Sequence, residues 1–329
     1  MKTEFDETVN EALSIARVSD SADLINKILN GNCLDVLKTI PDNSIDCCIT
    51  SPPYWGLRDY GHDEQIGSET HFKDFVSNLS NVFDEVQRVL KPTGTCFVNL
   101  GDTYGTQSGG MAGGFKEPKY GHTETRKVKQ PNINMHKSLC LVPERFAIEM
   151  IDRGWTLRNQ IIWHKPNQMP SSAKDRFTVD FEKVFFFVKQ PTGYYFEQQF
   201  EDLIGNPKDK ERQKRTGSSN QKYVQVHGNK PSSGGVGYSE FGRNTRTVWS
   251  INTIPNSEAH FATYPQTLVE RMLKAGCPEN GIVLDPFFGS GTTGVYARKV
   301  NRNFIGIELN PEYVKIAENR LFKEIGMFL

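Results

Sequence analysis

One stretch near the carboxyl end constrains the fold of this 329-residue chain more than any other. Apolar Ile282–Leu284 is followed by Asp285 and by a glycine-rich turn, Pro286–Gly294. This order predicts a strand, an acidic corner, a tight turn and the start of a helix. A glycine backbone lets a ligand approach closely, because any Cβ would collide with it. We therefore expect a ligand site here, at the carboxyl edge of an α/β sheet.

The next predicted strand, Phe304–Ile307, ends at Glu308, whose carboxylate is well placed to accept hydrogen bonds from ribose hydroxyls. The glycines at 289, 291 and 294 also fit the G-x-G-x-x-G pattern of dinucleotide-binding folds, so a dehydrogenase is an alternative. However, only about 20 residues follow Glu308, too few for the rest of such a sheet. The remaining strands must come from upstream, which predicts a circularly permuted order and disfavours a dehydrogenase.

The upstream sequence alternates helical and strand-like segments, as α/β proteins do. The apolar spacing predicts a helix-and-strand lead-in at Ser19–Leu37 and Ile45–Thr50, a helix at Phe72–Leu90, a strand at Thr95–Leu100, a helix at Val142–Arg153, a hairpin of Leu157–Trp163 with Lys183–Val188, and helices at Pro265–Ala275, Thr292–Val300 and Pro311–Leu321. We therefore expect a doubly wound α/β fold whose mostly parallel sheet includes one antiparallel hairpin.

A second motif, Ser51-Pro52-Pro53-Tyr54, closes the predicted strand Ile45–Thr50. Proline fixes φ and removes a donor, so neighbouring carbonyls are held outward and unpaired. The Ser51 hydroxyl and such a carbonyl can accept hydrogen bonds from an amino group and point its lone pair at an electrophile. Tyr54 offers a ring face to a base taken out of a helix. A rigid turn with a buried tyrosine is the alternative interpretation.

The formal net charge is zero, with 39 cationic and 39 acidic residues, so the chain as a whole does not indicate a polyanionic partner. Two irregular segments are nevertheless basic: Asn206–Thr247, and the glycine-rich Tyr104–Lys137, which we expect to be a mobile insertion that closes over DNA. A solvated basic loop is the alternative for each. The candidate DNA contacts are Lys214, Arg215, Lys222, Arg243, Arg246, Lys127 and Lys129.

Other sequence features exclude several classes of protein. The six cysteines form no C-x-x-C pair and no histidine spacing suits zinc, so we expect no metal site. Residues 1–20 lack the apolar core of a signal peptide, and no stretch approaches the length of a membrane span. We therefore expect a cytoplasmic protein.

Together the two motifs resemble those of the β group of DNA amino-methyltransferases, in which an S/D-P-P-Y motif precedes a D-P-F-x-G-S-G-T motif. The similarity covers much of Asn30–Leu321, including Leu157–Asn167 and His260–Pro265. It implies a seven-stranded, permuted methyltransferase sheet, S-adenosylmethionine as the methyl donor and double-stranded DNA as the substrate. The implied divisions are an N-terminal extension (1–23), a catalytic half (24–205, with the insertion at 104–138), a target recognition region (206–247) and a cofactor-binding half (248–329).

The resemblance also implies roles for individual residues. The catalytic tetrad would be Ser51, Pro52, Pro53 and Tyr54. Residues around the methionine part of the cofactor would be Asp285, Pro286, Phe287, Gly289, Ser290, Gly291 and Thr292, with Asp285 near its amino group. Glu308 would hold the ribose, and His260, Phe261 and Ala262 would cover another side. Asn32 stands where relatives often have an acidic residue near the adenine.

The first residue of the tetrad bears on the substrate. In this family serine is usual in N4-cytosine enzymes and aspartate in N6-adenine enzymes, so Ser51 predicts transfer to N4 of cytosine. The alternatives are an N6-adenine enzyme, a methyltransferase of RNA or protein, and a DNA-binding protein without activity. The resemblance raises a second copy of the chain and a cognate restriction endonuclease as partners.

Overall fold

The computed structural model describes residues 21–56, 65–105, 135–201, 243–253 and 264–326. The chain divides into two compact units. The larger unit comprises Met1–Phe196 and Val248–Leu329, and the smaller one is Glu197–Thr247. In the smaller unit, β6 (Phe200–Glu201) pairs antiparallel with β7 (Arg243–Asn244).

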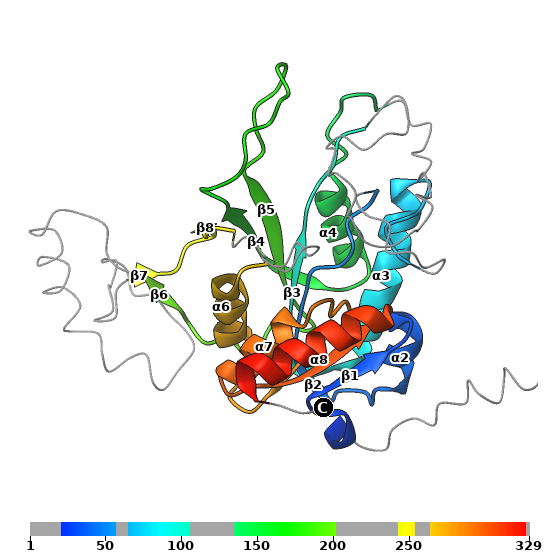
Figure 1. The fold of residues 1–329 in the computed structure, drawn as a ribbon, viewed down its shortest axis with the longest axis vertical. Helices are drawn as coiled ribbons and strands as arrows, with labels where there is room; N and C mark the ends of the chain where they lie inside the picture. Colours follow the sequence, from blue (N-terminus) through cyan, green and yellow to red (C-terminus); the bar gives the residue numbers. More distant parts are fainter. Residues whose placement is uncertain (1–20, 57–64, 106–134, 202–242, 254–263, 327–329) are drawn as a thin grey trace, which may run out of the picture. The chain divides into compact units, whose positions relative to one another are not determined.

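The larger unit is built on an eight-stranded sheet with the order β1-β10-β9-β2-β3-β5-β4-β8 (Figure 1). Its strands are β1 (Lys27–Asn30), β2 (Ile45–Thr50), β3 (Leu90–Leu100), β4 (Thr156–His164), β5 (Phe181–Val188), β8 (Val248–Ser250), β9 (Ile282–Asp285) and β10 (Asn303–Glu308). The first five strands in this order are parallel, and β5 pairs antiparallel with both β3 and β4. The mostly parallel sheet and the antiparallel hairpin are thus confirmed.

Helices cover both faces of this sheet (Figure 1). They are α2 (Cys33–Thr39), α3 (Phe72–Val89), α4 (Val142–Asp152), α6 (Gln266–Gly276), α7 (Thr292–Lys299) and α8 (Pro311–Ile325). Buried side chains of α2, α3 and α4 pack in one core, and those of α6, α7 and α8 pack in the other. Strand β2 lies between them, and its alternating side chains enter both: Cys48 faces the first core, and Cys47 and Ile49 face the second.

Two predictions about strands were wrong. The sheet has eight strands instead of seven, because the three-residue strand β8 adds to β4 at the edge. The predicted lead-in helix over Ser19–Leu37 is interrupted by β1, with a short 3-10 helix at Ser21–Leu24 before it and α2 after it. Strand β1 has only four residues and gains its hydrogen bonds from β10, more than 270 positions away in the chain. Four residues are too few to show the alternation of a strand, and the partner that makes them a strand is distant in the sequence.

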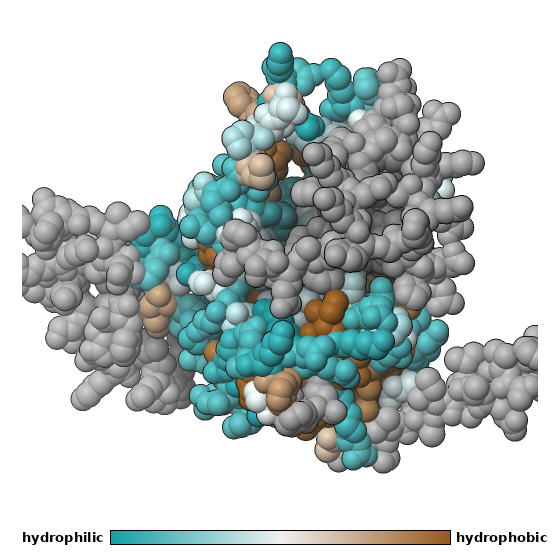
Figure 2. All heavy atoms as spheres, in the orientation of Figure 1, coloured by the Kyte–Doolittle hydropathy of each residue, from teal (hydrophilic) through white to brown (hydrophobic). Residues whose placement is uncertain are grey.

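The face shown in Figure 2 is mainly hydrophilic where α8 crosses it, in keeping with the exposed charged residues along that helix. Among the described residues, no helix is both long and apolar enough to cross a membrane.

Candidate active site

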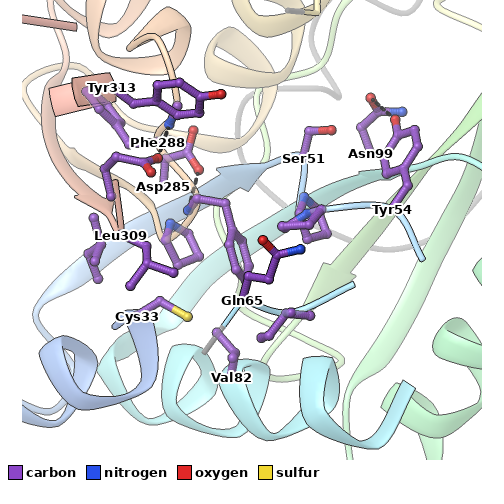
Figure 3. A pocket seen from close by; sticks show the side chains of 18 of the residues that line it. Cys33, Ser51, Tyr54, Gln65, Val82, Asn99, Asp285, Phe288, Leu309 and Tyr313 are labelled. Carbon is purple, nitrogen blue, oxygen red and sulfur yellow. Dashed lines mark hydrogen bonds between the residues drawn. The ribbon is translucent and has the colours of Figure 1, made fainter. Parts of the chain in front are cut away.

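A cavity of about 880 Å³ opens where β2, β9 and β10 end, and residues of the larger unit line it. The Ser51–Tyr54 tetrad, which follows β2, lines the cavity together with residues of the turn after β9. In Figure 3, Asp285 and Phe288 lie toward one end of the pocket, Tyr54 and Asn99 lie toward the other, and Ser51 lies between them. The structure therefore brings the two sequence motifs into one pocket, although more than 230 residues separate them.

Asp285 anchors the turn that follows β9, and only 2% of the residue is exposed. One carboxylate oxygen accepts hydrogen bonds from the Thr50 hydroxyl (2.6 Å) and the Phe287 N–H (3.1 Å). The other accepts from the hydroxyls of Thr293 (2.6 Å) and Tyr264 (3.2 Å). Burial raises the pKa of Asp285, while these hydrogen bonds act in the opposite direction. The carboxylate thus ties β2, α7 and Tyr264, two residues before α6, to the turn.

The glycine turn itself has a conformation that suits glycine at two positions. Gly289 has φ +53° and Gly291 has φ +78°, both in the left-handed region. A Cβ added at Gly289 would meet no atom closer than 4.0 Å, so it would project into open space. At Gly294, by contrast, there is no space for a Cβ, because an added one would lie 2.6 Å from the Phe288 ring that packs there. The third glycine of the G-x-G-x-x-G pattern therefore has a packing role.

Glu308 and Asn32 also line the cavity. The Glu308 carboxylate accepts hydrogen bonds from the backbone N–H groups of Gly289 (2.8 Å) and Asn310 (2.8 Å), so it joins the end of β10 to the glycine turn. The Asn32 side chain accepts from the Leu34 N–H (3.0 Å) and caps α2. Both residues thus have a local structural role beside any contact with a ligand.

In the part of the chain that the structure describes, the two side chains of the tetrad that could contact a base differ in their surroundings. Ser51 is half-buried, and among the described residues no side chain or backbone group is hydrogen-bonded to its hydroxyl. The Tyr54 ring lies against Gly101, where an added Cβ would come within 2.5 Å of the ring. The Tyr54 hydroxyl donates to a carboxylate oxygen of Glu182 (2.7 Å), and the Asn99 amide oxygen lies 3.3 Å away. The tetrad therefore presents an acceptor and a positioned aromatic face.

The family described as DNA methylase, N6_N4_Mtase, matches residues 45–319 of this chain. The chain belongs to this family. It is 40% identical over 297 residues to the type II methyltransferase M.Cfr9I of Citrobacter freundii, covering 89% of this chain and 87% of that protein. It is 37% identical over 299 residues to the type II methyltransferase M.SmaI of Serratia marcescens, covering 90% and 91%. The chain is thus a type II DNA methyltransferase.

Two solved structures share the fold of this DNA methylase. The cytosine-N4-specific PvuII DNA methyltransferase has a TM-score of 0.58 and 19% identity, covering 88% of this chain and 84% of that one. M1.HpyAVI in complex with S-adenosylmethionine has a TM-score of 0.52 and 18% identity, covering 90% and 98%. At these identities the likeness concerns the fold alone.

S-adenosyl-L-methionine is the cofactor of this DNA methylase. The residues of the cavity fit it: the volume lies in the range of cofactor sites, Gly289 has no Cβ to fill the space beside it, and Glu308 places a carboxylate at the wall. When bound, the cofactor supplies a methyl group already activated by its sulfonium.

Two further residues of the DNA methylase pocket, Lys165 and Glu182, were absent from the sequence-based site. The Lys165 ammonium forms an ion pair with Glu182 and lies 4.4 Å from the centre of the Trp163 ring. Glu182 in turn holds Tyr54. Lys165 belongs to the segment Leu157–Asn167 that resembles the family, which is a usable signal. No pattern in the sequence pointed to Glu182.

We expect Glu182→Leu to lower kcat for methyl transfer to DNA about tenfold, because Tyr54 loses a hydrogen bond to a charged acceptor. The Kd for S-adenosylmethionine should not change. In a double-mutant cycle with Tyr54→Phe, the two losses should be less than additive, because both substitutions remove the hydrogen bond between Tyr54 and Glu182, and only Glu182→Leu also breaks the ion pair with Lys165. Glu182→Gln keeps an acceptor and should recover part of the rate. Glu270→Leu, which removes only an α6 contact with Lys274, is the control. Additive losses would contradict the positioning role.

The predicted DNA contacts are only partly described. Arg243 and Arg246 lie in the smaller unit, and both contact one carboxylate oxygen of Glu201, at 2.9 Å and 2.7 Å. The charges of both guanidinium groups are therefore partly neutralised by Glu201 in the absence of DNA. The other predicted contacts lie outside the described residues, as do three of the predicted cofactor contacts: Lys127, Lys129, Lys214, Arg215, Lys222, His260, Phe261 and Ala262.

Proposed function

We propose that this DNA methylase transfers the methyl group of S-adenosylmethionine to N4 of cytosine in double-stranded DNA. The observation that carries the proposal is the Ser51 hydroxyl, which forms no hydrogen bond with a described residue and lies between the glycine turn and the Tyr54 ring in one cavity. A hydroxyl at this position matches the tetrad that is usual in N4-cytosine enzymes of the family.

In the proposed mechanism the target cytosine leaves the duplex and stacks on Tyr54. The Ser51 hydroxyl and the Pro52 carbonyl accept hydrogen bonds from the N4 amine and direct its lone pair away from the ring. The Glu182 contact keeps Tyr54 from turning out of the stack. Because the methyl group is already activated, orientation by these residues supplies most of the rate acceleration.

The proposed cofactor contacts follow the walls of the cavity. Phe287 and the turn Gly289–Thr292 would surround the methionine part, and Glu308 would bind the ribose hydroxyls. Because four protein donors already occupy the Asp285 carboxylate, we propose that it acts by fixing this turn. The family's permuted motif order would account for the position of β9 and β10 between β1 and β2.

The remaining parts of the proposal concern DNA and partners. The basic segments at 104–138 and 206–247 would contact phosphates and base edges, with 206–247 as the target recognition region. A second copy of the chain and a cognate restriction endonuclease are the proposed partners, as type II systems suggest.

Mass spectrometry of nucleosides tests the substrate base. Purified protein is incubated with S-adenosylmethionine and mixed-sequence DNA, and the digested DNA is analysed. We expect N4-methylcytosine. A matched reaction with Tyr54→Ala protein, for which the largest loss of turnover is expected, controls for methylation by contaminants. Detection of N6-methyladenine would refute cytosine as the target base but would agree with DNA methylation by this protein. If no base were methylated on several DNAs, catalysis on DNA by this chain alone would be refuted.

A further inference from the structure

The loop between β4 and β5, Lys165–Asp180, exposes three large apolar side chains, those of Met169, Phe177 and Val179. Phe177 is 95% exposed and Met169 is 80% exposed, the highest values among the large hydrophobic residues that the structure describes. Figure 1 shows this loop as a projection that extends beyond the ends of β4 and β5. A fully exposed phenylalanine ring does not stabilise the fold, because none of its apolar surface is removed from water. Such exposure can instead mark a binding surface.

The loop is held in place by contacts along its length. At its base, the Asn167 amide donates to the Thr253 carbonyl (2.8 Å) and accepts from the Thr253 N–H (2.9 Å). Nearer its tip, the Arg176 guanidinium lies 3.6 Å from the centre of the Tyr104 ring. Asp175 forms an ion pair with Lys137 at 2.7 Å. These contacts hold Asp175 and Arg176, the two residues that precede the exposed ring, so Phe177 is presented outward by an anchored loop.

The loop also starts at the rim of the catalytic pocket. Its residues Lys165 and Gln168 line the cavity that holds Ser51 and Tyr54. A base that enters this cavity from a duplex brings the adjoining base pairs to the same rim. Lys174 is exposed on the loop and forms no ion pair with a described residue, so its ammonium is available to a phosphate.

We propose that this loop binds the DNA duplex beside the target base and that Phe177 enters the base stack there. Moving a base out of the helix leaves an apolar gap between two base faces, and unstacking costs a few kcal/mol. An inserted apolar side chain lowers that cost, because it stacks on the faces that the base has left. The inference rests on the proposed base extrusion and holds for either target base.

The target site is first located by sequencing DNA that the enzyme has methylated. The test then compares two unmethylated duplexes that contain this site. In one duplex the target base is paired; in the other it faces an abasic position, so extrusion is already easy. We expect Phe177→Ala to lower kcat/KM about tenfold or more on the paired duplex and much less on the second. Phe177→Trp should recover activity. Phe322→Ala, an exposed phenylalanine on α8, is the matched control and should behave as wild type.

A binding measurement makes the test independent of turnover. Tryptophan fluorescence of Phe177→Trp should be quenched by the paired duplex more than that of wild type, which has four tryptophans of its own. Equal losses of Phe177→Ala on both duplexes, wild-type activity on the paired one, or no added quenching would overturn the proposal. A dimer that Phe177→Ala dissociates, with equal losses on both duplexes, would instead assign the loop to contact between copies. If the methylated base were adenine, the proposal of cytosine as the substrate would be refuted, and the proposal for Phe177 would still stand.

Discussion

Replacing Tyr54 by alanine is expected to lower kcat for methyl transfer to DNA about 100-fold or more, with little change in the Kd for S-adenosylmethionine. The ring is held by Gly101 and Glu182 and is the proposed stacking face for the base, a contact worth about 1–3 kcal/mol, to which misorientation adds. Single-turnover kinetics and isothermal titration with the cofactor measure the two quantities. Tyr54→Phe keeps the ring and should lose only about tenfold.

Ser51→Ala should show the same separation of turnover from cofactor binding, with a loss of about 10- to 100-fold, since one of two acceptors for the amine is removed. Ser51→Thr, which retains a hydroxyl, is the control for this position. Wild-type turnover in both Tyr54→Ala and Ser51→Ala would remove the tetrad from the catalytic site.

The second large effect is expected at Asp285, where alanine should lower the free energy of unfolding by about 3 kcal/mol and abolish measurable cofactor binding. The substitution leaves the hydroxyls of Thr50, Thr293 and Tyr264 and the Phe287 N–H without their acceptor in a buried site. Urea unfolding with and without S-adenosylmethionine measures both effects.

Asp35→Ala is the matched control for Asp285→Ala, because it removes a surface carboxylate on α2 that contacts only Lys38 in an exposed ion pair. Its free energy of unfolding should stay close to that of wild type. An Asp285→Ala protein that unfolds at the wild-type urea concentration and still gains stability from the cofactor would show that the four hydrogen bonds do not hold the turn.

The sequence predicted best those elements that carry a full periodic pattern. In α3 the apolar residues recur at helical spacing, and eight of them from Phe72 to Val89 are buried against the sheet. The hairpin of β4 and β5 was predicted from two strand-like segments that are adjacent in the sequence order, although the loop Lys165–Asp180 separates them. Strands β1 and β8 carry no such pattern, because each has at most four residues and exists only through its partner in the sheet.

Some residues of the candidate site could be predicted from the sequence, and others could not. The tetrad and the glycine turn were predicted because each is continuous in the chain and follows a strand. Glu182 and Gly101 could not be predicted, since the contact of Gly101 with Tyr54 depends on the pairing of β2 with β3, and that of Glu182 depends on how β5 is aligned with β3. In that register Leu100 faces Lys183, which brings Glu182 beside the end of β3 and so to the tetrad. Register of this kind follows from the packed sheet as a whole.

The position of β9 and β10 also governs how this protein can fold as it is synthesised. Strand β2, all six of whose residues are buried, has β9 as its neighbour on one edge, and β9 leaves the ribosome more than 230 residues later. Until then, a nascent chain holds an open apolar strand edge in the middle of its future sheet. The cofactor turn is completed only with this last step. A nascent chain therefore gains its ability to bind S-adenosylmethionine and its protection against aggregation at the same time.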